Sequence, residues 1–175
     1  DAARGGPEMT DRDVLSGIPL FAEVLDEASL TALAAGATRV EYDRGAVLIE
    51  EHAPGDSMFV IVRGAVAVSV RDGGKDRRVA TLHDGDVVGE MSLLTGARRA
   101  ATVTAMRPTV AIEIPRSALA PILAAAPDLA DHFAAIIEGR KKELDALYGE
   151  RHWLTSGSPA SEVADRVRRF FSRAG

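Results

Sequence analysis

The chain has 175 residues, of which 46% are hydrophobic and 27% charged, and this is ordinary for one globular domain with short appendages. It has no cysteine, which excludes disulfides and thiolate metal sites and fits a reducing compartment, so we expect a cytoplasmic protein. The net charge of -5 argues against nucleic-acid binding by the molecule as a whole, and no apolar run approaches the roughly 20 residues that span a bilayer.

The two ends of the chain differ from its middle. Residues 1–10 are polar and rich in glycine, so we expect a flexible linker there. The N-terminus shows no signal-peptide pattern. The chain begins with Asp1 instead of Met, which predicts a piece excised from a longer parent protein. Residues 138–175 carry a net charge of +2, against -7 for the rest of the chain, so the basic excess lies at the C-terminal end.

Residues 11–37 carry a helical pattern with a break at Gly17-Ile18-Pro19. We expect Asp26 to cap a helix that runs to about Gly36. Four apolar residues recur at helical spacing and give this helix one buried face: Leu30, Leu33, Ala34 and Ala37.

Residues 38–115 follow a different pattern. Short segments rich in Val, Ile and Thr alternate with turns that contain glycine. Such closely spaced strands predict a sandwich or a small barrel. Asp72-Gly73-Gly74 separates two of the segments and predicts a hairpin tip.

Residues 89–103 suit an anion that also carries a hydroxyl group. Gly89-Glu90 opens a short helical turn, where unpaired backbone N–H groups attract negative charge. Arg98-Arg99 closes the turn, and an arginine can grip phosphate oxygens at two points. A carboxylate can only accept hydrogen bonds, so Glu90 needs a hydroxyl or an amine to face. Ala100-Ala101 then leave room for the ligand to approach the backbone.

The helical pattern returns after Pro115. Leu119, Ile122 and Leu123 predict a short helix that ends near Pro127. We expect Asp128 to cap a longer helix, and residues 155–159 to form a linker before a final amphipathic helix. The apolar faces of these two last helices would carry Phe133, Ile137, Leu144 and Leu147, and then Val163, Val167, Phe170 and Phe171.

The segment 89–103 closely resembles the phosphate-binding cassette of cyclic nucleotide-binding domains. That cassette reads Gly-Glu, a few small or apolar residues, a Gly, and then Arg followed by small residues and Thr. The resemblance covers about residues 15–148, since residues 42–49 are similar to the early strand pair of the family, residues 54–68 to its central strands, and residues 82–89 to the approach to the cassette.

The resemblance implies an α+β fold. An antiparallel β-roll of about eight strands, similar to a jelly roll, would carry N-terminal helices, a short phosphate-binding helix and C-terminal lid helices. The chain would then divide into a linker at 1–10, a cyclic nucleotide-binding domain at 11–149, and a linker with a short amphipathic helix at 150–175. Within the domain, the roll would occupy about 38–115 and the C-terminal helices about 116–149.

The resemblance also assigns roles to residues. Arg99 would pair with the exocyclic oxygens of the cyclic phosphate, and Glu90 would accept a hydrogen bond from the ribose 2′-hydroxyl. In the family, a hydroxyl residue directly after this arginine is associated with a preference for guanine. Ala100 has no hydroxyl, so the resemblance favours cAMP as the ligand, with cGMP as the other candidate. The remaining cassette residues would supply backbone donors or room for the ligand: Gly89, Met91, Ser92, Ala100 and Ala101.

The base would rest against Val79, Val87 and Val103, and Arg140 would stack over it as a lid by a cation–π contact. Each assignment has an alternative. Arg99 would otherwise be a surface residue in an ion pair, and Glu90 would be a carboxylate stabilised by the helix dipole. The three valines would be ordinary core residues, and Arg140 would belong to a solvated run of basic residues. We expect Arg98 to be solvated or paired locally.

We expect no catalysis. The four histidines are scattered without the spacing of a metal site, and no nucleophile elbow is recognisable. No metal cluster is evident that would activate water, so the domain would bind and release its nucleotide unchanged, with no metal and no other cofactor.

Residues 167–171 resemble the C-terminal tail of bacterial mechanosensitive-type channels that carry this domain, and the N-terminal helices resemble those that join it to a channel pore. Only 26 residues follow Gly149, too few for a helix-turn-helix domain. The favoured interpretation is therefore the regulatory domain of a bacterial ion channel, on the cytosolic face of the inner membrane. Its partners would be the nucleotide and an effector domain of the same parent chain, which could form a homo-oligomer, with membrane contact only through that parent.

Three other interpretations stay open. The chain could be the regulatory domain of a non-channel protein or a free-standing cAMP sensor. It could also be a metal-dependent enzyme on a β-barrel, or a degenerate module that binds only a protein partner. Glu90 and Arg99 argue against the last.

Overall fold

The structure is a computed structural model that describes residues 10–95, 98–99, 101–125, 128–129, 131–132 and 134–135. Three helices come first, α1 (Asp11–Ser16), α2 (Pro19–Ala22) and α3 (Glu27–Ala35), and α5 (Arg116–Ala125) follows the strands. The strands are β1 (Thr38–Tyr42), β2 (Val47–Ile49), β3 (Ser57–Arg63), β4 (Ala65–Asp72), β5 (Lys75–His83), β6 (Val87–Val88), β7 (Thr102–Ala105) and β8 (Thr109–Pro115). A further short helix, α4 (Glu90–Thr95), lies between β6 and β7.

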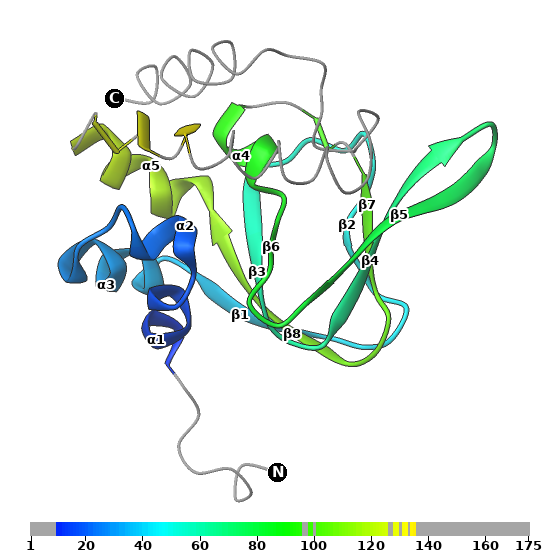
Figure 1. Ribbon diagram of the computed structural model, residues 1–175, viewed down its shortest axis with the longest axis horizontal. Coiled ribbons are helices and arrows are strands. Elements are labelled where there is room, and N and C mark those ends of the chain that lie inside the picture. The colour runs from blue at the N-terminus through cyan, green and yellow to red at the C-terminus, as the bar shows by residue number, and fades with distance from the viewer. Residues whose placement is uncertain are drawn as a thin grey trace, which may run out of the picture.

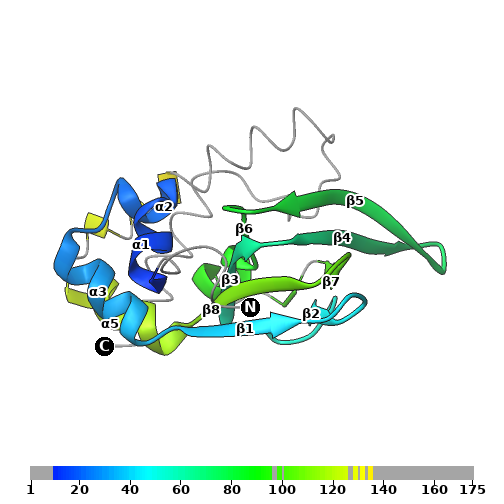
Figure 2. The ribbon, with the colours of Figure 1, turned by 90° about the horizontal axis from the view of Figure 1, so that it is seen from below.

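The strands form two antiparallel sheets, with the orders β1-β8-β3-β6 and β2-β7-β4-β5. Figures 1 and 2 show α1, α2, α3 and α5 gathered at one end of the molecule. The expected antiparallel roll with N-terminal helices and a short inserted helix is confirmed, with eight strands in the described part of the chain. The expected long lid helix and the amphipathic C-terminal helix lie almost wholly outside the described residues.

Strands β4 and β5 form a long hairpin that extends away from the helices (Figure 2). Asp72 pairs with Lys75, so the turn consists of Gly73 and Gly74 alone. Both glycines have positive φ, 61° and 83°, which is the backbone of a tight two-residue hairpin turn. The hairpin tip expected at this place is confirmed.

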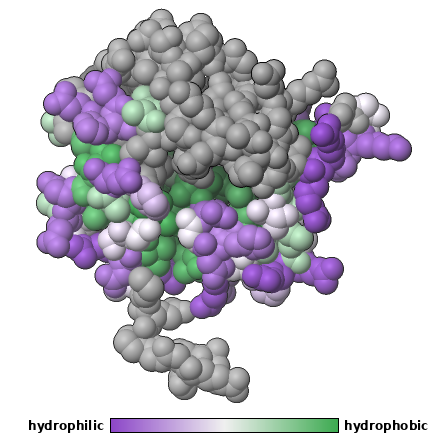
Figure 3. Space-filling view, in the orientation of Figure 1, coloured by the Kyte–Doolittle hydropathy of each residue, from purple (hydrophilic) through white to green (hydrophobic). Residues whose placement is uncertain are grey.

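Two separate apolar clusters form the core. The helix-side core lies between the helices and the first sheet, and the roll-interior core lies between the two sheets. Strand β3 contributes to both, because its side chains alternate: Met58 and Val60 belong to the helix-side core, Phe59 and Ile61 to the roll-interior core. In the face shown in Figure 3, hydrophobic residues gather near the middle and hydrophilic residues lie around them.

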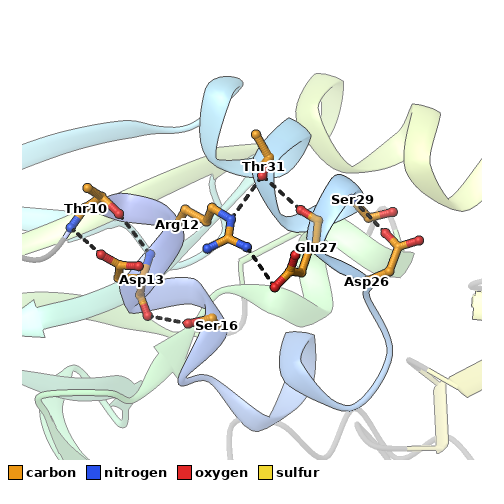
Figure 4. Close-up of polar contacts among 8 residues, drawn as sticks. All are labelled: Thr10, Arg12, Asp13, Ser16, Asp26, Glu27, Ser29 and Thr31. Atoms are coloured by element: carbon orange, nitrogen blue, oxygen red, sulfur yellow. Dashed lines mark hydrogen bonds and ion pairs between the residues drawn. The ribbon is translucent and has the colours of Figure 1, made fainter.

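The N-terminal helices are fixed by local caps and by packing. Asp26 accepts a hydrogen bond of 2.8 Å from the backbone N–H of Ser29, and the helix it caps ends at Gly36, as expected. Arg12 of α1 donates to Thr31 Oγ1 of α3 at 3.0 Å and lies 3.6 Å from the Glu27 carboxylate, which ties these two helices together (Figure 4). The expected apolar face of α3 is buried, at Leu30 and Leu33.

The described helices are all too short or too polar to cross a bilayer.

Candidate ligand-binding site

Arg99 lies just before β7, and its backbone is held by the loop between β2 and β3. Its N–H donates to the carbonyl of Ala53 at 2.9 Å, and its own carbonyl accepts from the N–H of His52 at 2.8 Å. These two backbone hydrogen bonds join the segment before β7 to the loop in the way that neighbouring strands of a sheet are joined. The position of Arg99 therefore depends on a loop more than 40 residues earlier in the chain.

The Arg99 side chain points inward. Its Nη1 donates to the carbonyl of Gly89 at 3.1 Å, and its Nη2 donates to Ser57 Oγ at 3.3 Å. Only 7% of the residue is exposed, which contradicts the alternative of a surface arginine in an ion pair. The guanidinium thus joins the start of β3 to the residue that precedes α4.

Two glycines form the walls of the slot that holds this guanidinium. A Cβ atom at Gly55 would lie 2.6 Å from Arg99 Cζ, and a Cβ at Gly89 would lie 2.7 Å from Arg99 Nη1. Gly89 also has a φ of 84°, which disfavours any other residue. The slot consequently accepts the guanidinium only because both positions lack a side chain.

The electrostatic surroundings of Arg99 have two opposing effects. Burial lowers the pKa of the guanidinium, while the carboxylates of Asp56, Glu113 and Glu90 act in the opposite direction and favour its charged form. An arginine remains protonated at neutral pH despite such a shift, so the slot holds a buried positive charge.

Glu90 is the first residue of α4, directly after the glycine that accepts from Arg99. It is 1% exposed, and its Oε2 atom is buried without a hydrogen bond from the described residues. Ser92, in the same turn, is also buried. The two cassette residues with the strongest expected roles, Glu90 and Arg99, therefore lie together.

The structure places the other expected site residues in different surroundings or does not describe them. Ala101 and Val103 are buried in the roll-interior core. Val87 is not, because it packs in the helix-side core, and its neighbour Val88 takes the interior position. A shift of one residue along a strand reverses the face, so Val87 and Val88 point to opposite sides of the sheet. The contact of Val87 with the base stays a prediction, beside the alternative of ordinary core. Four expected site features lie outside the described part of the structure: Ala100, Arg140 and the side chains of Val79 and Met91.

Sequence reasoning missed three residues of the site, Gly55, Asp56 and Ser57. They follow one another at the start of β3, and they were recognised only as a glycine corner before a strand. Nothing in the local pattern relates them to Arg99, because the contact spans 42 residues.

An open pocket borders this site on the side of α5. It is lined by polar groups at one end and by small apolar residues along the helix: Asp56, Pro115, Arg116, Ser117, Ala120, Pro121 and Ala124. The N–H of Arg116 donates to the carbonyl of Asp56 at 2.8 Å, which attaches the start of α5 to the start of β3. Asp56 therefore borders both the pocket and Arg99.

Within the described residues, no group of three or more acidic or histidine side chains is placed to hold a metal ion.

Residues 39–126 match the family model of the cyclic nucleotide-binding domain. The chain belongs to this family. The expected family is therefore confirmed, and the matched range contains the residues around Arg99, from Gly55 and Ser57 to Gly89 and Glu90.

Three proteins illustrate what this family member is similar to. The cAMP-dependent protein kinase regulatory subunit of Dictyostelium discoideum is 34% identical over 96 residues, which cover 53% of this chain and 29% of that protein. The regulatory domain of Toxoplasma gondii PKA, solved as a co-crystal with cAMP, has a TM-score of 0.63 and 26% identity, and the match covers 91% of this chain and 56% of that chain.

The third is the N-terminal domain of a transcriptional regulator from Streptomyces coelicolor A3(2), with a TM-score of 0.62 and 31% identity. The match covers 77% of this chain and 95% of the Streptomyces coelicolor domain. The chain spans less than a third of the length of the first curated relatives that it matches.

Proposed function

We propose that this chain is a regulatory domain that binds 3′,5′-cAMP and transmits the binding event through a helix movement. The observation that carries the proposal is the buried guanidinium of Arg99, whose hydrogen bonds within the described residues go to two neutral oxygens, the Gly89 carbonyl and the Ser57 hydroxyl. A buried charge is costly without an opposite charge in direct contact. The cyclic phosphate monoanion would offset that cost by accepting from the guanidinium at two points.

Glu90 supports a sugar phosphate rather than a simple anion. A carboxylate next to an anion site repels the anion unless a donor lies between them, because an ionised carboxylate only accepts hydrogen bonds. The ribose 2′-hydroxyl of a cyclic nucleotide is such a donor, and it is the one sugar hydroxyl left free when the phosphate bridges the 3′ and 5′ oxygens. The burial of Glu90 beside Arg99 fits this arrangement.

The choice of cAMP over cGMP rests on two supports. Ala100 offers no hydroxyl for a guanine amino group. The names of the Dictyostelium discoideum subunit and the Toxoplasma gondii co-crystal both refer to cAMP. The ligand would leave unchanged, and it would shift the domain between two states by its differential affinity for them.

The effector is a separate part of the proposal. Control of a bacterial ion channel stays a prediction from the ends of the chain. The relatives described above are regulators of a kinase or of transcription, and they support a ligand-sensing module linked to another effector, or a free-standing sensor, equally well.

Calorimetric titration of the purified chain with three nucleotides tests the ligand. We expect saturable one-to-one binding of cAMP, affinity weaker by about tenfold for 2′-deoxy-cAMP, which lacks the hydroxyl opposite Glu90, and little binding of 5′-AMP, whose phosphate is not cyclic. Glu90→Gln should reduce the difference in binding affinity between cAMP and 2′-deoxy-cAMP. Absence of cAMP binding, or equal affinity for cAMP and 5′-AMP, would contradict the proposal.

A further inference from the structure

Two adjacent arginines, Arg98 and Arg99, serve different partners in this structure. Successive side chains of an extended segment point to opposite sides. Arg99 points into the slot, while Arg98 stays exposed and its Nη1 donates to the carbonyl of His52 at 3.0 Å. The partner of Arg98 is thus a backbone group of the loop that leads to β3.

The backbone of His52 has an unusual conformation that requires stabilising contacts. Its φ of 71° is positive, and among the described residues other than glycine it alone has this conformation. Such a conformation costs an L-residue energy and persists where its surroundings enforce it. Here the His52 N–H donates to the Arg99 carbonyl and the His52 carbonyl accepts from the Arg98 side chain, so both backbone groups of the strained residue are bound by the arginine pair.

The loop that His52 begins leads directly to the slot. Gly55 is three residues further on and forms one wall, and Ser57 is five residues further on and accepts from Arg99 Nη2. The Gly55 wall leaves no room for movement toward the guanidinium, since a Cβ there would already overlap with it. A change in the direction of the chain at His52 would therefore move the wall and the Ser57 hydroxyl together.

We propose that Arg98 is a positioning residue for the nucleotide: by clamping the carbonyl of His52 it holds the loop 52–57 against Arg99 and keeps the guanidinium in its binding position. This inference extends the proposed function of the site. Arg98 is exposed, as expected for a solvated residue, but the partner of its hydrogen bond is not local, because His52 lies 46 residues earlier. Arg98 itself does not touch the ligand in this arrangement.

Another arginine provides a matched control. Arg107 is also exposed, and its Nη2 donates to the carbonyl of Gly64, a residue that likewise has a positive φ, 120°. Arg107→Met removes a bond of the same kind from a loop outside the slot. Arg98→Met and Arg107→Met are thus equivalent in chemistry and differ in which loop they release.

The test measures the Arg99 guanidinium directly by NMR, as the solvent exchange rate of its Nε–H in the ligand-free protein, together with the cAMP affinity of the same variants. We expect Arg98→Met to accelerate this exchange by about tenfold and to weaken cAMP binding by a similar factor, because the wall of the slot is released. Arg107→Met should leave both quantities at their wild-type values, with a comparable change in the thermal midpoint.

Exchange at Arg99 that is unchanged in Arg98→Met, or accelerated equally in Arg107→Met, would overturn the inference. Because the exchange measurement needs no ligand, it still tests the clamp if the wild-type chain fails to bind cAMP. That failure would count against the proposed function alone.

Discussion

The guanidinium of Arg99 lies directly against the α-carbon of Gly55, so closely that a methyl group at Gly55 would come within 2.6 Å of Arg99 Cζ and 2.7 Å of its Cδ. Gly55 precedes β3 and Arg99 precedes β7. Strands β3 and β7 belong to different sheets of the roll. The slot for the guanidinium is therefore formed by contacts between segments far apart in the chain, and it is sensitive to a single added carbon.

Gly55→Ala is expected to damage the site more than the fold. The new methyl group would push the guanidinium away from Gly89 and Ser57, and we expect cAMP affinity to fall by about tenfold or more, as for the loss of a hydrogen bond to a charged group. Calorimetric titration gives the affinity, and urea unfolding gives the stability.

Gly17→Ala is the matched control for this change. Gly17 has a negative φ of -89°, and the atom nearest to a Cβ there is a carbonyl oxygen at 3.5 Å, so an added methyl group has room. We expect its cAMP affinity to match that of the wild type. If Gly55→Ala bound cAMP with wild-type affinity, the close contact between Gly55 and the Arg99 guanidinium would not matter for binding.

His52 offers a prediction about stability. Glycine at this position would relieve the positive φ, worth about 1–2 kcal/mol, and would cost about 0.5–1 kcal/mol of chain entropy, so we expect His52→Gly to raise the free energy of unfolding slightly. Valine tolerates this backbone poorly, so His52→Val should lower the free energy of unfolding by about 1 kcal/mol or more. Urea unfolding curves provide both values, and the opposite order of the two variants would contradict the strained backbone.

Tyr42 offers a prediction about alkaline pH. Burial raises the pKa of its hydroxyl above the ordinary value of about 10, and the carboxylate of Glu113 acts in the same direction. The unfolded chain therefore loses this proton at a lower pH than the folded chain. The stabilisation is complete below pH 10 and is lost as pH rises from 10 through the higher folded-state pKa.

Tyr42→Phe isolates this effect, because the ring and its edge-on contact with Phe59, at 6.5 Å between ring centres, are retained. We expect the free energy of unfolding to fall less steeply above pH 10 in the variant than in the wild type, with parallel curves at neutral pH. Parallel curves through the alkaline range would show that Tyr42 ionises equally in both states.

The features that the sequence predicted correctly are those with a local cause. Gly73-Gly74 dictates a tight turn through its positive φ, and Asp26 caps α3 through a hydrogen bond three residues away. The order of glycine, acid and arginine in residues 89–99 predicted that Glu90 and Arg99 act together, and the structure buries both, with Glu90 among the carboxylates that act on Arg99. Their binding of a nucleotide stays a prediction. Patterns of this kind need no knowledge of the tertiary structure.

The features that were missed depend on non-local contacts or on register. Ser57 joins the site only because β3 and the segment before β7 meet across 42 residues of chain. Val87 and Val88 are both apolar and neighbouring, so composition alone could not decide which of them faces the roll interior. The partner of Arg98 is a backbone carbonyl in a strained loop, and no residue pattern marks such a partner.

The most direct test of the central claim is the cAMP affinity of Arg99→Met, measured by calorimetry beside the wild type and Arg107→Met. Loss of a two-point, charge-assisted contact predicts that cAMP affinity is weaker by at least about 100-fold in Arg99→Met, since each such hydrogen bond contributes about 1.5–3 kcal/mol. Arg107→Met should bind like the wild type. Wild-type affinity in a folded Arg99→Met would contradict the claim that this buried guanidinium binds the cyclic phosphate.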